Sequence, residues 1–210
     1  MGVLEQIIDC GVVAVLRADS SAELLDVAEA LRKGGVVAIE VTMTTPGALK
    51  VIEEAAAKMK DSIIGVGSVL DPETARAAIL AGAEYVVAPT LNLGVIEMAK
   101  RYGKVVMPGA FTPTEILTAW QAGADVVKVF PASVGGPAYF KDVKGPLPQV
   151  RLMPTGGVDL TTTGAFIKAG ACAVGAGGAM VDKKAVTAGK FDVITETARK
   201  FVEEVRKARA

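Results

Sequence analysis

The sequence contains no histidine among its 210 residues. This absence excludes Ser-His-Asp and Cys-His catalysis, zinc sites of the HExxH type and every imidazole acid or base. Proton transfer must therefore use carboxylates, lysine, tyrosine or water. Cysteine is also scarce. Cys10 and Cys172 lie far apart and in no CxxC arrangement, which is typical of packing roles in a reducing compartment.

An excess of charge is lacking too, because 23 lysines and arginines balance 23 aspartates and glutamates. A net charge of zero gives no indication of a nucleic-acid binder, so we expect a small-molecule partner. Mean hydropathy is +0.42, yet no uninterrupted apolar run reaches the roughly 18 residues of a membrane span. Residues 1–9 have no basic region and include Glu5, so we expect no signal peptide and a cytoplasmic protein. The surplus apolar surface favours a subunit interface.

Short β-rich runs alternate along the chain with helical segments rich in alanine, leucine, lysine and glutamate. This alternation is typical of βα units around a parallel sheet. The length favours one domain that spans residues 1–210. The eight predicted strands are residues 12–17, 37–43, 63–69, 85–88, 105–108, 126–130, 150–154 and 171–175.

Glycine recurs where a predicted helix ends and the next strand approaches, as in Ala-Gly-Ala at residues 81–83 and 169–171. Glycine suits the left-handed position that ends many helices. This recurrence, with strands apolar on both faces, predicts an α/β fold of the (β/α)8 TIM barrel type with an additional N-terminal helix. A doubly wound open sheet is the alternative. No GxGxxG or GxxxxGK[ST] motif follows the first strand, which argues against it.

One lysine, Lys128, interrupts the apolar strand predicted at residues 126–130. A buried ammonium is unfavourable, so such a lysine readily loses its proton and becomes a nucleophile. Glu40 stands in a similar apolar strand. In a barrel both would lie toward the C-terminal strand ends, where chemistry occurs, and could pair across the mouth. The alternatives are a lysine that extends to solvent and a buried structural ion pair.

Other polar or glycine-rich positions fall at predicted strand ends. Arg17 ends the first strand and Ser68 lies at the end of the third. The last two strands end in Pro-Thr-Gly-Gly at residues 154–157 and Gly-Ala-Gly-Gly at residues 175–178, where barrels commonly bind phosphate through backbone N–H groups. Simple turns are the alternative reading of these clusters. The predicted phosphate-binding residues are Gly156, Gly157, Gly177 and Gly178.

Five segments occur in consistent order and spacing. They are Ile39-Glu-Val-Thr42, Pro108-Gly109 with Thr112-Pro-Thr-Glu115, Val127-Lys-Val-Phe-Pro131, Lys144-Gly-Pro146 and Pro154-Thr-Gly-Gly157. Together they resemble the 2-keto-3-deoxy-6-phosphogluconate (KDPG) aldolase family, also described as 4-hydroxy-2-oxoglutarate (KHG) aldolases. The resemblance covers residues 12–194. It implies a homotrimeric class I lyase that needs no metal or cofactor and acts in the Entner-Doudoroff pathway of carbohydrate metabolism. The implied reaction cleaves KDPG to pyruvate and glyceraldehyde 3-phosphate, with KHG, cleaved to pyruvate and glyoxylate, as a second substrate.

The same resemblance implies that Lys128 forms a Schiff base with the substrate's C2 ketone and that Glu40 shuttles protons through water. Thr44 stands where some members carry a carboxylate-binding arginine, and Arg17 could supply that cation. Gly178 stands where many members have a serine. The glycine keeps the backbone N–H but lacks the hydroxyl, which favours a nonphosphorylated substrate. The substrate-binding candidates are Arg17, Thr44, Ser68, Pro89, Pro108, Phe130 and Thr155.

The residue types are sufficient for this reaction without reference to the family. Cleavage of a C–C bond next to a carbonyl leaves a carbanion. An iminium on Lys128 would delocalise that negative charge and give an enamine. The chain has neither histidine nor clustered carboxylates at strand ends, so we expect no metal site. Two alternatives belong to other classes. A phosphosugar isomerase or epimerase would not need a covalent lysine, and a catalytically idle barrel used as an assembly module would form no Schiff base.

Overall fold

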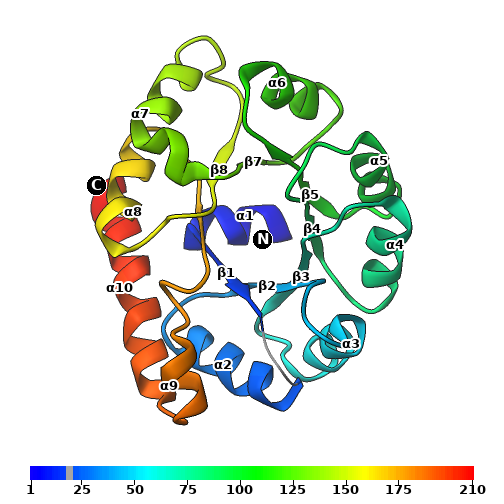
Figure 1. Cartoon of the computed structure of the whole chain (residues 1–210), viewed down its shortest axis with the longest axis vertical. Helices are drawn as coiled ribbons and strands as arrows, with labels where there is room; N and C mark the ends of the chain where they lie inside the picture. The colour runs from blue at the N-terminus through cyan, green and yellow to red at the C-terminus, as the bar shows by residue number, and fades with distance from the viewer. Residues whose placement is uncertain (18–20) are drawn as a thin grey trace.

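The computed structural model describes residues 1–17 and 21–210 (Figure 1). Its strands are β1 (Val12–Leu16), β2 (Ala38–Thr42), β3 (Ile63–Gly67), β4 (Tyr85–Val87), β5 (Val105–Met107), β6 (Gly109–Ala110), β7 (Val127–Val129), β8 (Leu152–Pro154) and β9 (Val174–Ala176). Its helices are α1 (Val3–Cys10), α2 (Ser21–Lys33), α3 (Ala48–Lys58), α4 (Pro72–Leu80), α5 (Leu93–Arg101), α6 (Pro113–Gln121), α7 (Ala132–Lys144), α8 (Leu160–Lys168), α9 (Lys183–Thr187) and α10 (Phe191–Arg209).

The strands close into a ring, with helices α2 to α10 around the outside (Figure 1). Within the described residues, six strands pair in the order β5-β4-β3-β2-β1-β9 and three in the order β6-β7-β8, all in parallel. Strands β5 and β6 are two parts of one barrel strand that is interrupted at Pro108, which has no N–H to donate. Bridges join Leu152 to Ala171 and Thr155 to Gly175 on the other side. The predicted (β/α)8 barrel is confirmed, and the open sheet is excluded.

Two strand predictions need correction. The strand predicted at residues 105–108 does not end there, because Gly109 and Ala110 pair with Lys128 and Val129. The last barrel strand begins at Val174 rather than at residue 171, because Ala171 makes only an isolated bridge. Both differences depend on which backbone lies opposite, and hydrophobic patterning does not contain that information.

Residues with known conformational preferences form the ends of α4 and α8. Asp71 caps α4, its side chain accepting the N–H of Thr74 at 2.6 Å, and Pro72 occupies the first helical position. Gly82 and Gly170 have φ angles of +111° and +99°, which confirms the left-handed glycine expected after α4 and α8. None of the described helices combines the length and the apolarity needed to cross a membrane.

The predicted additional N-terminal helix, α1, lies across one end of the ring (Figure 1). Its Ile7 is fully buried in a cluster with residues of the barrel interior such as Val13, Ala38 and Met107. Arg209 of α10 holds α1 in place, because its guanidinium donates to the carbonyl oxygens of Ile8 and Asp9 at 2.6 and 2.8 Å. The N-terminal end of the barrel is therefore closed by apolar packing, which leaves the C-terminal strand ends for a binding site.

Candidate active site

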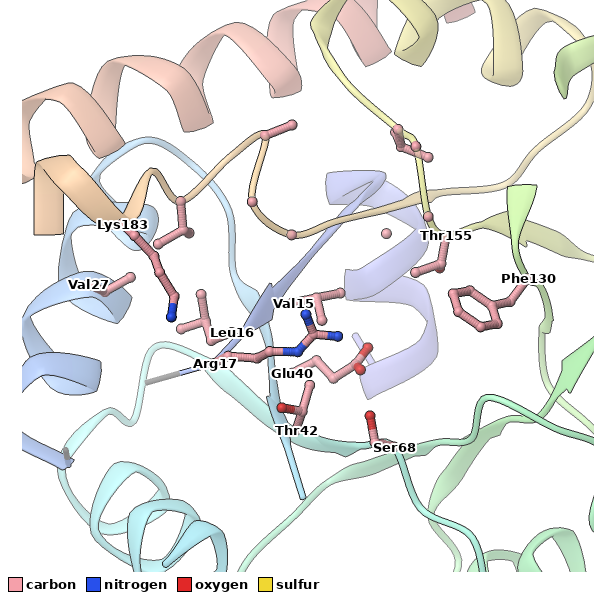
Figure 2. A pocket seen from close by; sticks show the side chains of 18 of the residues that line it. Val15, Leu16, Arg17, Val27, Glu40, Thr42, Ser68, Phe130, Thr155 and Lys183 are labelled. Carbon is pink, nitrogen blue, oxygen red and sulfur yellow. The ribbon is translucent and has the colours of Figure 1, made fainter. Parts of the chain in front are cut away.

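A cavity of about 470 Å³ opens at the C-terminal ends of the barrel strands (Figure 2). Its lining brings together candidates that the sequence spreads over more than 160 positions, since parallel strands of a barrel end at the same face. The predicted residues that line it are Arg17, Glu40, Ser68, Pro89, Lys128, Phe130, Thr155, Gly156, Gly157, Gly177 and Gly178.

Two predicted substrate-binding residues lie outside this lining. Thr44 is exposed beyond the end of β2, and its hydroxyl bonds to that of Thr42 at 2.8 Å. Thr42, the last residue of β2, lines the cavity instead. Pro108 is buried between β5 and β6, where its carbonyl oxygen accepts the N–H of Lys128 at 2.9 Å. Pro108 thus anchors the strand that carries Lys128 rather than facing the cavity.

Lys128 is the central residue of β7 and is only 5% exposed. Side chains alternate along a strand, so Val127 and Val129 pack in the layer under the helices while Lys128 points into the barrel. Its Nζ lies 5.1 Å from the centroid of the Phe130 ring, within the range of a cation–π contact. The amine is therefore buried in the cavity beside the Phe130 ring.

Glu40 of β2 is 1% exposed and reaches the same cavity. A Cβ on Gly67 would lie 1.8 Å from its Oε1, so the carboxyl occupies space that only glycine leaves free. Burial raises the pKa of Glu40 above its ordinary value, while the positive charges of Lys128 and Arg17 partly offset that effect. Figure 2 shows the guanidinium of Arg17 directed toward Glu40. A carboxyl with a raised pKa is suited to both accept and return a proton.

Ser68 follows β3 at the cavity edge with a φ of +59°, a left-handed conformation that non-glycine residues rarely adopt. Strained backbones of this kind cluster at functional sites. Figure 2 shows its hydroxyl close to the part of the cavity that Glu40 lines. The prediction that Ser68 lies at the pocket agrees with this placement.

The glycine clusters border the cavity and differ in how tightly they pack. Gly156 and Gly157 have φ angles of +86° and +77°, and a Cβ on Gly157 would lie 2.6 Å from the Cβ of Ser133. Nothing described lies within 4 Å of a Cβ built on Gly178. The first cluster therefore requires glycine, whereas position 178 has room for a larger side chain.

Several charged lining residues escaped the sequence-based prediction. Glu23 of α2, Asp159 and Lys183 face the cavity, and Figure 2 shows Lys183 directed toward the part lined by Leu16 and Val27. Lys183 comes from the short helix α9 beyond the last barrel strand, so the pattern of polar residues at strand ends does not include it. The available signal was the Lys-Lys pair five residues after the glycine cluster. Within residues 1–17 and 21–210, no group of three or more Cys, Asp or Glu side chains is arranged to hold a metal ion.

Comparison with known proteins agrees with this architecture. The model of the KDPG and KHG aldolase family matches residues 3–197. A 2-dehydro-3-deoxy-phosphogluconate aldolase of Pseudomonas aeruginosa is 34% identical over 91% of this chain and 88% of its own length. A KHG/KDPG aldolase of Escherichia coli is 31% identical over 95% of this chain and 94% of its own.

A solved structure extends the comparison to the reaction. The KDPG aldolase of Legionella pneumophila, with pyruvate captured at low pH as a covalent carbinolamine intermediate, has a TM-score of 0.84 and 27% identity. The match covers 92% of this chain and 96% of that one. The family match spans the whole barrel, including β2 with Glu40 and β7 with Lys128. This chain therefore belongs to the KDPG and KHG aldolase family and is a class I, Schiff-base aldolase, a lyase.

Proposed function

We propose that the enzyme cleaves KDPG to pyruvate and glyceraldehyde 3-phosphate, with Lys128 as the amine that forms the Schiff base and Glu40 as the proton-transfer group. The observation that carries this assignment is the presence of one buried lysine and one buried carboxyl in a single cavity at the barrel mouth. KHG, the shorter substrate named for the Escherichia coli relative, is the second substrate that we propose.

The proposed reaction begins when the neutral Nζ of Lys128 attacks the C2 ketone and forms a carbinolamine. Loss of water leaves an iminium, and Glu40 transfers the protons that this step requires. Glu40 then takes the proton of the C4 hydroxyl, the C3–C4 bond breaks, and its electron pair flows into the iminium to give an enamine and the free aldehyde. Protonation of the enamine at C3 and hydrolysis of the iminium release pyruvate and restore Lys128.

The surroundings of Nζ favour the charged intermediate. The Phe130 ring beside the amine can stabilise the iminium through its π face. The raised pKa of Glu40 brings the protonated and ionised forms of that carboxyl closer in free energy, so one group can serve the proton transfers in both directions. Arg17 lies near enough to lower the pKa of Glu40, and we propose that it also binds the substrate carboxylate.

The distal phosphate of KDPG has candidate partners at the cavity rim. Backbone N–H groups near Gly156, Gly157, Gly177 and Gly178 border the cavity, and Lys183 adds a positive charge from α9. We propose that this rim binds the phosphate. The cation of Lys183 would compensate for the hydroxyl that Gly178 lacks.

We further propose a cytoplasmic homotrimer. Leu70 and Leu93 are 59% and 54% exposed, and the Asn92 side chain joins their two loops by donating to the Leu70 carbonyl oxygen at 2.9 Å. Exposed apolar side chains on neighbouring loops favour a protein interface. Sedimentation analysis of the enzyme and of the double variant Leu70→Glu, Leu93→Glu would measure the oligomeric state. A wild-type enzyme that sediments as a monomer would refute this proposal.

Borohydride trapping tests the assignment of Lys128. Pyruvate with borohydride should attach one reduced pyruvate to the peptide that contains Lys128, and the adduct should be absent from Lys128→Met. Lys183→Met is the matched control, because it removes another cavity lysine and should leave the adduct in place. An adduct on any other lysine, or none in the wild-type enzyme, would overturn the proposed mechanism.

A further inference from the structure

Glu40 shares its level of the barrel interior with a tyrosine. The strand register places Glu40 opposite Gly65 and Gly65 opposite Tyr85, on β2, β3 and β4. Side chains that are opposite one another in a parallel sheet point to the same face. The Tyr85 side chain therefore points into the barrel with Glu40, and it is 0% exposed in the interior cluster.

Gly65 lets the two side chains approach each other. A Cβ on Gly65 would lie 2.3 Å from Cζ of Tyr85, the ring carbon that bears the hydroxyl. The ring thus extends from β4 across β3 in the direction of β2, where Glu40 stands. Gly67, two residues further along β3, leaves the space that the Glu40 carboxyl fills. The two inward-facing glycines of β3 therefore leave space for the tyrosine ring and for the carboxyl, two residues apart along the strand.

Both polar ends lack a direct partner among the described residues. The hydroxyl of Tyr85 and Oε2 of Glu40 are buried and form no hydrogen bond within that part of the chain. An unpaired buried hydroxyl is unfavourable, and phenylalanine would fill the same volume without that cost. Burial, and secondarily the charge of Glu40, raises the pKa of Tyr85 well above its ordinary value, so the phenol keeps its proton and can donate it in a hydrogen bond.

We propose that Tyr85 is a positioning residue for Glu40, whose carboxylate receives a hydrogen bond from the Tyr85 hydroxyl through one buried water. A buried water of this kind needs two or more polar partners, and these two groups supply them. The bond stabilises the ionised carboxyl that accepts the substrate's proton. This inference rests on the proposed role of Glu40.

The other ionisable groups near the pair do not replace this donor. Lys128 and Arg17 act on Glu40 through their charges, and Cys10 of α1 is the further group that acts on Tyr85. Among residues 1–17 and 21–210, the remaining charged side chains that line the same cavity are Glu23, Asp159 and Lys183. Replacing Tyr85 by phenylalanine therefore removes a neutral hydrogen-bond donor while the surrounding charges stay in place.

The test is the dependence of kcat/KM on pH in Tyr85→Phe. Loss of one hydrogen bond to the ionised carboxyl should move the acidic limb to higher pH by about one unit. Activity above the limb and the melting temperature should change little, because phenylalanine keeps the ring. Tyr102→Phe is the matched control, since Tyr102 is exposed at the end of α5 and away from the cavity lining. It should leave the profile unshifted.

A second variant tests whether the shift acts through Glu40. In the Glu40→Gln background, Tyr85→Phe should cause no further shift. A shift that persists there, or identical profiles for wild type and Tyr85→Phe, would overturn the inference. Borohydride trapping separates this outcome from failure of the proposed function. If Tyr85→Phe forms the Lys128 adduct and its profile is unshifted, only the role of Tyr85 is rejected, whereas a wild-type enzyme without the adduct rejects the mechanism.

Discussion

Replacing Gly67 by alanine should displace the Glu40 carboxyl and leave most of the barrel undisturbed. The added Cβ would lie 1.8 Å from Oε1, 2.4 Å from Cδ and 2.6 Å from Cγ of Glu40. An ordinary contact between carbon and oxygen is about 3.3 Å, so Oε1 must move by about 1.5 Å. Misplacement of a catalytic group by about 1 Å costs about 10²-fold in rate. We therefore expect kcat/KM to fall by about 10²-fold, equivalent to about 2.7 kcal/mol of transition-state stabilisation.

The stability of this variant should change much less than its activity. Overpacking costs about 1–3 kcal/mol in a closed core, but Glu40 borders an open cavity into which its side chain can move. Alanine in a strand also recovers about 0.5–1 kcal/mol relative to glycine. The expected net loss of unfolding free energy is about 0–2 kcal/mol.

The assay is pyruvate release at saturating and limiting substrate, with thermal unfolding measured on the same preparations. Gly164→Ala is the matched control, because Gly164 lies in α8 outside the cavity lining and a Cβ there would make only ordinary contacts, at 3.8 Å and longer. It should retain the wild-type rate within a factor of about three, since small surface changes cost little. A Gly67→Ala enzyme that is folded and fully active would refute the argument, because the position of the Glu40 carboxyl would then not matter for catalysis.

Three further predictions follow from the same cavity. Glu40→Gln should lower turnover by about 10²-fold or more. Because the folded-state pKa of Glu40 is raised, the unfolding free energy of the wild type falls as pH rises from the ordinary value of 4.5 through the folded pKa. Above that pH window, urea unfolding should show Glu40→Gln to be more stable relative to wild type than it is at lower pH. Gly178→Ser should lower KM for KDPG alone, by up to about tenfold for one hydrogen bond of about 1 kcal/mol, and an equal effect on KHG would place residue 178 outside the phosphate site. Arg17→Ala should raise KM for both substrates, because both carry the carboxylate, and unchanged KM values would refute this role.

The placement of the central pair was accessible from the sequence. Lys128 and Glu40 each interrupt an apolar run, and an ionisable group within a buried strand is rare enough to be informative by itself. Both were expected at the barrel mouth, and both line the cavity there. The caps of α4 and the glycines after α4 and α8 were equally accessible, because they depend on the conformational preferences of a few neighbouring residues.

Other placements depended on where each strand stops and which strand lies beside it. Thr44 was expected in the pocket, yet β2 ends two residues earlier and presents Thr42 instead. Lys183 reaches the cavity from a helix beyond the last strand. The nearest charged lining residue in the sequence is Asp159, before α8. Hydrophobic periodicity does not predict that these side chains line the cavity, because they come together only when the ring of strands is closed.

The sequence by itself determined the alternation of strands and helices, the barrel class and two candidate reactive groups, because hydrophobic period, glycine placement and buried ionisable residues are local properties of the chain. Only the tertiary structure decided that Tyr85 lies over Gly65, that the Glu40 carboxyl fills the space left by Gly67, and that Pro108 interrupts a barrel strand. These contacts depend on register between strands, and register is set by the closure of the whole ring rather than by any one segment.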